Sequence, residues 1–427
     1  MHRRYFIFVF SSTPKEKLEE TGVTAIKLLS LFSGIGAFEK ALNRLGKKYE
    51  LVNYCEIDKF ASKAYSLIHK VPESMNLVDV TQIDCAKLPK GIDMITYGFP
   101  CQDISIAGKQ RGLEADGVKT RSGLVFDALH IIEEVKPKYA ICENVKNLTG
   151  KKFKLEFEYI LKCLEELGYN NYWKVLNAAD YGVPQKRERV FIVSIRKDID
   201  KGSFDFPEPI PLQKTLKDLM EKEVDSKYFL SERLVNYFYE NMKKNKEKGN
   251  GFSFKPISNT EVVAKTITTK AGIRMDDNFI KVKELTSNQS QAKRVYDSEG
   301  LAVTIKSCAG GLGAKTGLYE VDSNIKVVGY YQPSCHEASR VLDAEGIAPT
   351  VKENHGTVNA VQLDSARKTS IRKLTPKECF RLMGFEDKDI DVLKQNNISD
   401  TQLYKMAGNS IVVDVLYYIF KNLLKDV

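Results

Sequence analysis

The chain has 427 residues, a net charge of +9 and 43% hydrophobic residues. This length allows two or three domains with a sizeable core, and the composition is ordinary for a soluble globular protein. The basic excess permits an anionic partner such as nucleic acid, although it fits a merely soluble basic enzyme as well. No stretch approaches the roughly 18 apolar residues of a membrane-spanning helix, so the sequence predicts no membrane association.

The eight cysteines are scattered through apolar segments, and none forms a C-x-x-C pair. This distribution is typical neither of a disulfide framework nor of a zinc site, and it favours a reducing cytoplasm. The five histidines lack metal-ligand spacing, and the pair Cys335-His336 has no further ligands nearby, so we expect no metal. Residues 1–24 hold an apolar run too short for a signal sequence, and we interpret them as an extension outside the core.

Regular alternation of strands and helices begins near Ala25. Helices are predicted at residues 33–46, 122–135 and 154–167 from the spacing of their apolar residues. Short apolar runs predict strands at residues 25–32, 50–56, 92–97, 136–145, 172–178 and 189–195. Alternating elements with short connections predict a doubly wound α/β domain with a mostly parallel sheet, which we assign to residues 25–205.

The turn after the first strand contains Gly34 and Gly36, where the lack of a side chain lets a ligand approach the backbone. Glu56 ends the second strand, at a spacing that suits a pair of ribose hydroxyls. Asp79 and Val80 offer an acceptor and an apolar contact to an adenine ring. Together these residues predict a cofactor that contains adenosine, whereas no glycine pattern indicates a phosphate site.

The segment GFPCQDIS, residues 98–105, follows the predicted strand at 92–97. In open α/β sheets, ligands bind beyond the carboxyl ends of the strands, where this segment lies. Cys101 and Glu143 both lie at such strand ends, so one cleft can hold a nucleophile and an acid. On position alone, Cys101 also fits a packing residue and Glu143 a capping or ion-paired acid.

The alternation of strands and helices ends near residue 206, where the proline-rich segment FPEPIPL (206–212) is typical of a linker. Residues 214–248 are predicted to be helical, and residues 250–365 an irregular β-rich region. This region contains a repeat, because RVYDSEGLAVTI (294–305) matches RVLDAEGIAPTV (340–351). We interpret each copy as a strand–turn–strand unit that also offers a glycine-rich loop to an extended ligand.

The last part of the chain is predicted to be helical again. Thr375 and Pro376 are typical of the first residues of a helix. Gly408-Asn409-Ser410 precede a strongly apolar segment, and we interpret them as the amino terminus of the last helix. Such a terminus is either a hydrogen-bonding site for a ligand or a simple cap.

Together, these motifs resemble the DNA (cytosine-5)-methyltransferase family, in its bacterial and phage restriction–modification form. GFPCQ with ENV (143–145) and Q-x-R-x-R (185–189) is the specific part of the resemblance. The other matching segments, all in the family's order, are LFSGIGAFE (31–39), Glu56, Asp79, RKLTPKECFRLMGF (372–385) and QLYKMAGNS (402–410). The resemblance implies the fold of S-adenosylmethionine-dependent methyltransferases, with a smaller, irregular β-rich target-recognition domain at 206–369 and a return segment at 370–427 that completes the catalytic domain.

The resemblance also implies a mechanism. Cys101 adds to C6 of a cytosine flipped out of duplex DNA, and C5 then takes a methyl group from S-adenosylmethionine. Arg187 and Arg189 supply positive charge near the thiolate and contact the cytosine O2 atom, and Glu143 holds N3 and the exocyclic amine.

The cofactor residues implied by the resemblance come from six segments of the chain. They are Phe32, Gly34, Gly36, Glu56, Ile57, Asp79, Val80, Pro100, Leu124, Asn409 and Ser410. Ile57 departs from the family, which often has an aromatic residue there, so stacking on adenine is lost while an apolar contact remains.

Two alternatives stay open at the level of sequence. The transfer-RNA branch of the family has a short insert between the motifs, whereas segment 206–369 is long and favours DNA. A DNA-binding regulator without catalysis is the second alternative. The resemblance further implies a monomeric cytoplasmic enzyme, with a cognate restriction endonuclease as a candidate partner acting on the same site.

Overall fold

The computed structural model describes residues 25–101, 103–104, 112–115, 118–247 and 369–425, together with parts of 254–283 and short strands between 295 and 362. The extension 1–24 lies outside the described residues. So do most of both repeat copies, of which the structure describes three short strands, β13 (Val295–Tyr296), β14 (Ala302–Val303) and β17 (Arg340–Asp343).

A six-stranded sheet in the order β2-β1-β3-β6-β9-β7 organises the larger part of the molecule. Its strands are β1 (Ile26–Leu31), β2 (Tyr49–Cys55), β3 (Met94–Tyr97), β6 (Tyr139–Val145), β7 (Tyr169–Asn177) and β9 (Glu188–Arg196). The first four strands in this order are parallel, and β9 runs antiparallel to both of its neighbours. The prediction of a mostly parallel α/β sheet is confirmed, whereas the reversal of β9 was not predicted.

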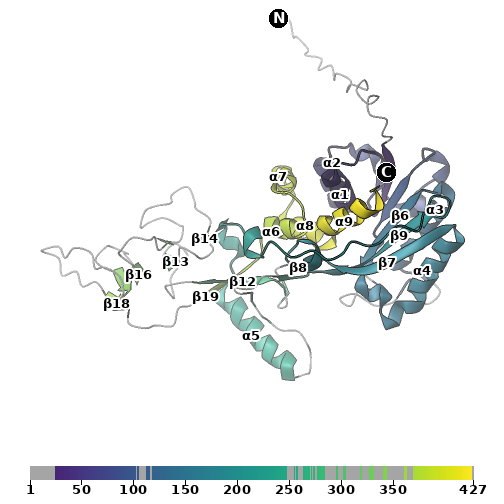
Figure 1. Ribbon diagram of the computed structural model, residues 1–427. Coiled ribbons are helices and arrows are strands. Elements are labelled where there is room, and N and C mark those ends of the chain that lie inside the picture. The colour runs from purple at the N-terminus through teal and green to yellow at the C-terminus, as the bar shows by residue number, and fades with distance from the viewer. Residues whose placement is uncertain are drawn as a thin grey trace, which may run out of the picture.

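Helices cover both faces of the sheet (Figure 1). They are α1 (Ala37–Leu45), α2 (Lys59–His69), α3 (Val125–Val135), α4 (Lys154–Glu166) and α9 (Val413–Leu423). Successive strand residues point to opposite faces, so Leu28 joins the core with α1 and α9, whereas Leu29 joins the core with α3 and α4. The apolar runs of the strands are therefore explained by burial on two sides.

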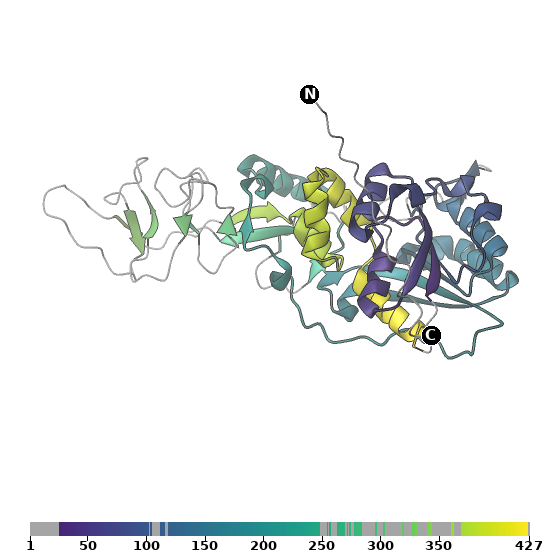
Figure 2. The same cartoon turned by 90° about the horizontal axis from the view of Figure 1, so that it is seen from above.

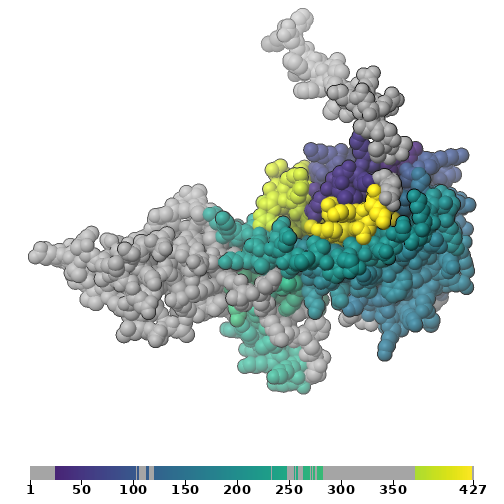
Figure 3. Space-filling view, viewed as in Figure 1, coloured from purple at the N-terminus to yellow at the C-terminus, as the bar shows by residue number. Residues whose placement is uncertain are grey.

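The end of the chain returns to the beginning of the sheet. The Phe420 ring of α9 lies 6.2 Å from the Phe38 ring of α1, and both side chains are buried. In the space-filling view, α9 lies against the surface of the amino-terminal elements, and the segment that follows β9 runs beneath it (Figure 3). Asn422 holds this segment by donating to the Asp205 carbonyl at 3.0 Å. One core is thus built from both ends of the described chain, while the three predicted boundaries between the four segments of the chain stay predictions.

Three more helices, α6 (Pro376–Leu382), α7 (Asp387–Gln395) and α8 (Asp400–Asn409), lie beside the amino-terminal helices (Figure 2). Helix α6 begins with the predicted Thr375 cap, whose hydroxyl accepts from the Glu378 amide. The prediction that Gly408-Asn409-Ser410 open the last helix is wrong. Asn409 is the last residue of α8 and Ser410 caps its carboxyl end, because buried Met406 and Ala407 extend the apolar face of α8.

The predicted helix over 214–248 is confirmed only for α5 (Glu232–Glu247). The side chains of Asp218 and Asp225 accept hydrogen bonds from the Thr215 and Lys227 amides and so favour turns. The remaining short strands are β4 (Glu114–Ala115), β5 (Val118–Lys119), β8 (Gln185–Lys186), β10 (Glu223–Val224), β11 (Ala264–Lys265), β12 (Phe279–Lys283), β15 (Leu318–Tyr319), β16 (Val327–Tyr330), β18 (Ala360–Gln362) and β19 (Thr369–Lys373). Pairing of β12 with β19 joins this second part to the return segment.

A buried ion pair fixes the start of the return segment. Arg372 donates to both carboxylate oxygens of Glu378, at 2.9 and 2.8 Å, and the two side chains are 0% and 1% exposed. The carboxylate also accepts from the amides of Thr375 and Glu221. The pair therefore anchors β19, helix α6 and the segment before α5 to one another.

Replacing Glu378 with alanine should lower the free energy of unfolding by about 3–5 kcal/mol, because it leaves a buried guanidinium without its counter-ion. Thermal and urea unfolding followed by circular dichroism measure this loss. The control is Glu166→Ala, since that carboxylate is 66% exposed and pairs with Lys162 at the surface, and it should cost less than about 0.5 kcal/mol. Equal effects of the two substitutions would show that burial of the Arg372 pair is not what stabilises this junction.

Candidate active site

Cys101, Glu143 and Arg189 meet at one edge of the sheet. Tyr97 of β3 is paired with Cys142 of β6, so the carboxyl ends of these strands are adjacent. A Cβ atom placed on Gly98 would lie 3.6 Å from Glu143 Oε2, which shows how closely the turn before Cys101 passes the carboxylate. Because β9 is antiparallel, its first residues reach the same edge, where Arg189 pairs with Val145.

Glu143 and Arg189 form an ion pair in a site largely shielded from water. Arg189 Nε lies 3.0 Å from Glu143 Oε1, and the side chains are 17% and 11% exposed, respectively. Burial raises the pKa of Glu143, and Arg189 and Arg187 oppose this effect. A carboxyl whose pKa is raised holds and releases a proton more readily near neutral pH.

Cys101 is half-buried beside these charges. Burial and the Glu143 carboxylate raise the pKa of its thiol, while Arg189 and Arg187 lower it. The thiolate is the nucleophilic form of cysteine. The two arginines therefore favour the reactive form, and the carboxylate opposes it.

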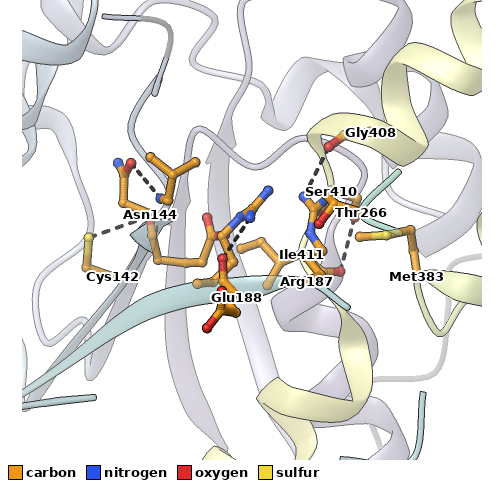
Figure 4. Close-up of polar contacts among 12 residues, drawn as sticks. Cys142, Asn144, Arg187, Glu188, Thr266, Met383, Gly408, Ser410 and Ile411 are labelled. Atoms are coloured by element: carbon orange, nitrogen blue, oxygen red, sulfur yellow. Dashed lines mark hydrogen bonds and ion pairs between the residues drawn. The ribbon is translucent and has the colours of Figure 1, made fainter. Parts of the chain in front are cut away.

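Arg187 is fully enclosed and joins three segments. Its guanidinium donates to the Ile267 carbonyl at 3.1 Å, and to the Gly408 and Ser410 carbonyls at 3.0 and 2.7 Å. Figure 4 shows this cation between β9 and the end of α8. Burial lowers the pKa of Arg187 to about 9, so the side chain stays charged at neutral pH. Its Nε atom has no partner among the described residues.

Two side chains that were not predicted hold the turn around Cys101. Asn144 donates to the Phe99 carbonyl at 3.0 Å, and Ser122 donates to the Pro100 carbonyl at 2.7 Å. Both side chains are buried. The sequence signal for Asn144 is its place within ENV, whereas nothing near Ser122 indicates its partner.

A second polar site lies at the ends of β1 and β2. The Glu56 carboxylate accepts from the Gly34 amide at 2.9 Å and from the Asp58 amide at 2.8 Å, and burial raises its pKa. Gly34 has φ 57°, and no atom lies within 4 Å of a Cβ atom placed there. The backbone beside Glu56 is thus accessible to a ligand. Gly36 has φ 78°, and a Cβ atom there would collide with the His69 ring at 2.0 Å.

The residues predicted at the adenine have different surroundings. Ile57 is 72% exposed, whereas the Val80 side chain is 6% exposed and packs in the core with α3. Asp79 caps a 3-10 turn by accepting from the Thr81 amide at 3.0 Å. Val78, which was not predicted, is 51% exposed and has φ 63°. The exposed apolar side chains at this place are therefore Ile57 and Val78.

The other predicted cofactor residues differ in exposure. Phe32, Pro100 and Leu124 are half-buried, Asn409 is exposed and Ser410 is buried. The link after α8 reaches the turn before Cys101, since a Cβ atom on Gly98 would lie 3.8 Å from Ile411 Cδ1. The end of α8 is thus in contact with Arg187 and with the Cys101 turn.

Comparison with known proteins decides the family. A model of the C-5 cytosine-specific DNA methylase family matches residues 26–425. The chain belongs to the C-5 cytosine-specific DNA methylase family. It is 34% identical to the orphan methyltransferase M.SPRI of Bacillus phage SPR, over 93% of this chain and 97% of that protein. It is 30% identical to the type II methyltransferase M.HhaI of Haemophilus parahaemolyticus, over 95% of this chain and 97% of that protein.

Solved structures support the same fold for this methylase. The crystal structure of S. pombe Dnmt2 methyltransferase superposes with a TM-score of 0.57 at 16% identity, covering 94% of this chain and 99% of that one. The Entamoeba histolytica methyltransferase EhMeth gives 0.59 at 15% identity, with 95% and 99% covered. At these identities the likeness concerns the fold alone.

The methylase is thus an enzyme that methylates cytosine in DNA at C5 and needs a methyl donor. The prediction of a DNA (cytosine-5)-methyltransferase is confirmed. Every helix among the described residues is too short or too polar to cross a bilayer. Within that same part of the chain, no group of three or more His, Cys, Asp and Glu side chains is arranged to hold a metal ion.

Proposed function

We propose that this methylase transfers the methyl group of S-adenosylmethionine to C5 of a cytosine flipped out of duplex DNA, through a covalent bond between Cys101 Sγ and C6. The observation that supports this most is the meeting of Cys101 with the shielded Glu143–Arg189 pair at one sheet edge. A nucleophile, a proton-holding acid and a fixed cation then face one ring. Both faces of that ring are inaccessible in a duplex, which is why the base must leave the stack.

The residues act in a fixed order in this proposal. The Cys101 thiolate forms a bond to C6 while Glu143 holds the proton at N3, which turns C5 into an enamine carbon. S-adenosylmethionine, when bound, would supply an electrophilic methyl group to C5 and leave as S-adenosylhomocysteine. Transfer of the C5 proton to water and release of the Cys101 thiolate from C6 then restore the aromatic ring. Arg189 keeps Glu143 in place, and Arg187 adds positive charge that favours the thiolate.

The second polar site fits the methyl donor. Each Glu56 oxygen accepts one amide hydrogen in the structure and has a further lone pair for a ribose hydroxyl. The accessible backbone at Gly34 gives room for the ligand beside that carboxylate. Ile57 and Val78 offer exposed apolar surface to the adenine. We therefore assign the adenosine part of the donor to this place.

The relatives are named type II and orphan methyltransferases. By analogy, we propose that this chain modifies cytosine within a defined DNA sequence. A cognate restriction endonuclease, a cytoplasmic location and a monomeric state are further predictions that follow from the family.

Bisulfite sequencing of DNA from a methylation-deficient host that expresses the chain tests this function. We expect 5-methylcytosine at one recurrent sequence, and none in the host with an empty vector. In vitro, the purified protein should transfer labelled methyl from S-adenosylmethionine to the same duplex, and 5-fluorocytosine at that position should trap a complex stable in detergent. Folded protein that leaves every cytosine of duplex DNA unmodified, or that methylates only transfer RNA, would contradict the proposal.

A further inference from the structure

Asn76 makes four hydrogen bonds around the loop that carries Glu56. Its Oδ1 atom accepts from the Glu56 and Val78 amides, each at 2.9 Å. Its Nδ2 atom donates to the Glu56 carbonyl and to the Ser62 hydroxyl, each at 2.9 Å. Two donated and two accepted bonds are the full capacity of a primary amide. The side chain is therefore held in one orientation by the Glu56 loop, by helix α2 and by its own segment.

The position of Asn76 explains why an amide is needed there. The Asn76 backbone forms a parallel bridge with Tyr54, and the Leu77 amide donates to the Tyr54 carbonyl at 2.7 Å. Strand β2 is the edge of the sheet, so the backbone of Glu56, just beyond its end, has no neighbouring strand of the sheet on its outer side. The Asn76 side chain takes that neighbour's place. An aspartate could not donate to the Glu56 carbonyl, and it would bring a second negative charge beside the carboxylate.

The Asn76 amide is also linked, through Ser62, to a series of buried side chains. Ser62 Oγ lies 3.2 Å from the Tyr54 hydroxyl, and the Tyr54 ring stacks on Tyr65 with centroids 4.1 Å apart. Tyr65 donates to a Glu39 carboxylate oxygen at 2.9 Å. All four of these side chains are buried. Asn76 thus connects the Glu56 loop with helix α1, which begins at the glycine turn.

We infer that Asn76 is a positioning residue for the methyl donor. It fixes the Glu56 carboxylate, which we assign to the ribose, relative to Val78, which we assign to the adenine, because one amide oxygen accepts from both backbones. This inference rests on the donor site proposed above. It predicts that Asn76 affects donor binding without touching the donor, and that it leaves the cytosine chemistry at Cys101 unchanged.

Binding of S-adenosylhomocysteine, measured by isothermal titration calorimetry on the full chain, tests the inference together with steady-state kinetics. Asn76→Ala should weaken binding by about 10-fold to 100-fold, since up to four hydrogen bonds are lost. The KM for S-adenosylmethionine should rise by a similar factor, with kcat and the KM for DNA within about threefold of wild type. Asn76→Asp should weaken binding as well.

Asn53→Ala is the matched control. Asn53 donates to the Met75 carbonyl at 3.0 Å, so it holds the same segment but contacts neither Glu56 nor Val78. The affinity of the Asn53→Ala variant for S-adenosylhomocysteine should stay within about threefold of wild type. Should Asn76→Ala fail to fold, Ser62→Ala removes one partner of the amide and should still weaken donor binding by about 3-fold to 10-fold.

The outcomes separate this inference from the donor site itself. If Asn76→Ala binds S-adenosylhomocysteine with wild-type affinity, the positioning role is overturned. If Asn76→Ala does not fold, wild-type affinity of Ser62→Ala overturns it in the same way. Equal losses in Asn76→Ala and Asn53→Ala would also overturn it, because the effect would then be general loosening of the segment. If wild-type protein does not bind S-adenosylhomocysteine, or if Glu56→Ala binds it equally well, the assigned donor site is wrong.

Discussion

The Cys101→Ala enzyme is expected to transfer no measurable methyl groups to DNA while it folds and binds its ligands as the wild type does. Direct attack of cytosine C5 on a methyl donor is slow, and in the proposed mechanism the thiolate is the group that makes C5 nucleophilic. Loss of a covalent nucleophile should therefore lower kcat by at least about 10,000-fold. Incorporation of labelled methyl into duplex DNA measures the rate, and circular dichroism with donor titration confirms folding.

The control for this substitution is Cys163→Ser, which alters a half-buried thiol on α4 outside the active site. It should retain activity and should still form the covalent complex with 5-fluorocytosine DNA, which Cys101→Ala should not form. Activity of Cys101→Ala within about 100-fold of wild type would show that another group is the nucleophile.

The pH dependence of trapping gives a second readout of the same assignment. Burial raises the pKa of Cys101 above the ordinary thiol value, so we expect the thiolate to be the minor form at neutral pH. The reactive thiolate becomes more abundant as pH increases toward that pKa. The rate of covalent trapping in the wild type should therefore increase from pH 7 to pH 8.5, by up to about tenfold per unit. A fall over this range in the rate at which iodoacetamide alkylates Cys101 would contradict a reactive thiolate, because that reaction needs no proton from Glu143.

The strands of the sheet could be predicted from sequence because burial on both faces leaves continuous apolar runs. Their directions could not, because an apolar run looks the same in either direction. The reversal of β9 brings Arg189 to the edge where Cys101 and Glu143 lie. The spacing of the apolar residues does not reveal the reversal of β9. Only the resemblance of Q-x-R-x-R to a known motif therefore placed Arg187 and Arg189 in the site.

The residues that sequence reasoning missed act through partners far along the chain. Ser122 holds the Pro100 carbonyl across 22 positions, and Asn76 holds Glu56 across 20. A single sequence shows that such a residue is polar, but not what it contacts. The wrong assignment at Asn409 has a local cause. Glycine often ends a helix, yet Gly408 lies within α8. The carbonyl groups of Gly408 and Ser410, near the end of this helix, accept hydrogen bonds from Arg187.

The second large effect is expected from Glu143→Gln. Glutamine keeps the size of the side chain, but it can neither hold nor release a proton at N3 of the cytosine. Loss of a positioned acid lowers kcat by about 100-fold to 10,000-fold. The DNA affinity should change much less, because one base contact of many is altered. Single-turnover methyl transfer with saturating DNA and donor measures the chemical step directly.

The control for Glu143→Gln is Glu188→Gln on the same strand pair. Glu188 pairs with Lys146 at 2.8 Å, and the side chains are 39% and 55% exposed. An ion pair this exposed contributes little, so the variant should transfer methyl within about twofold of wild type. Methyl transfer by Glu143→Gln within about tenfold of wild type would contradict its assignment as the acid that holds N3.

A second readout separates proton transfer at the base from ionisation of the thiol. The Glu143 carboxylate raises the pKa of Cys101, so its replacement by a neutral amide should lower that pKa. Alkylation of Cys101 by iodoacetamide at pH 7.5, followed by mass spectrometry of its peptide, should therefore be faster in Glu143→Gln than in the wild type. Methyl transfer should be slower in the same variant. Opposite changes in the two rates are expected only if Glu143 acts on the cytosine, because an acid that served merely to activate the thiol would change both rates in the same direction.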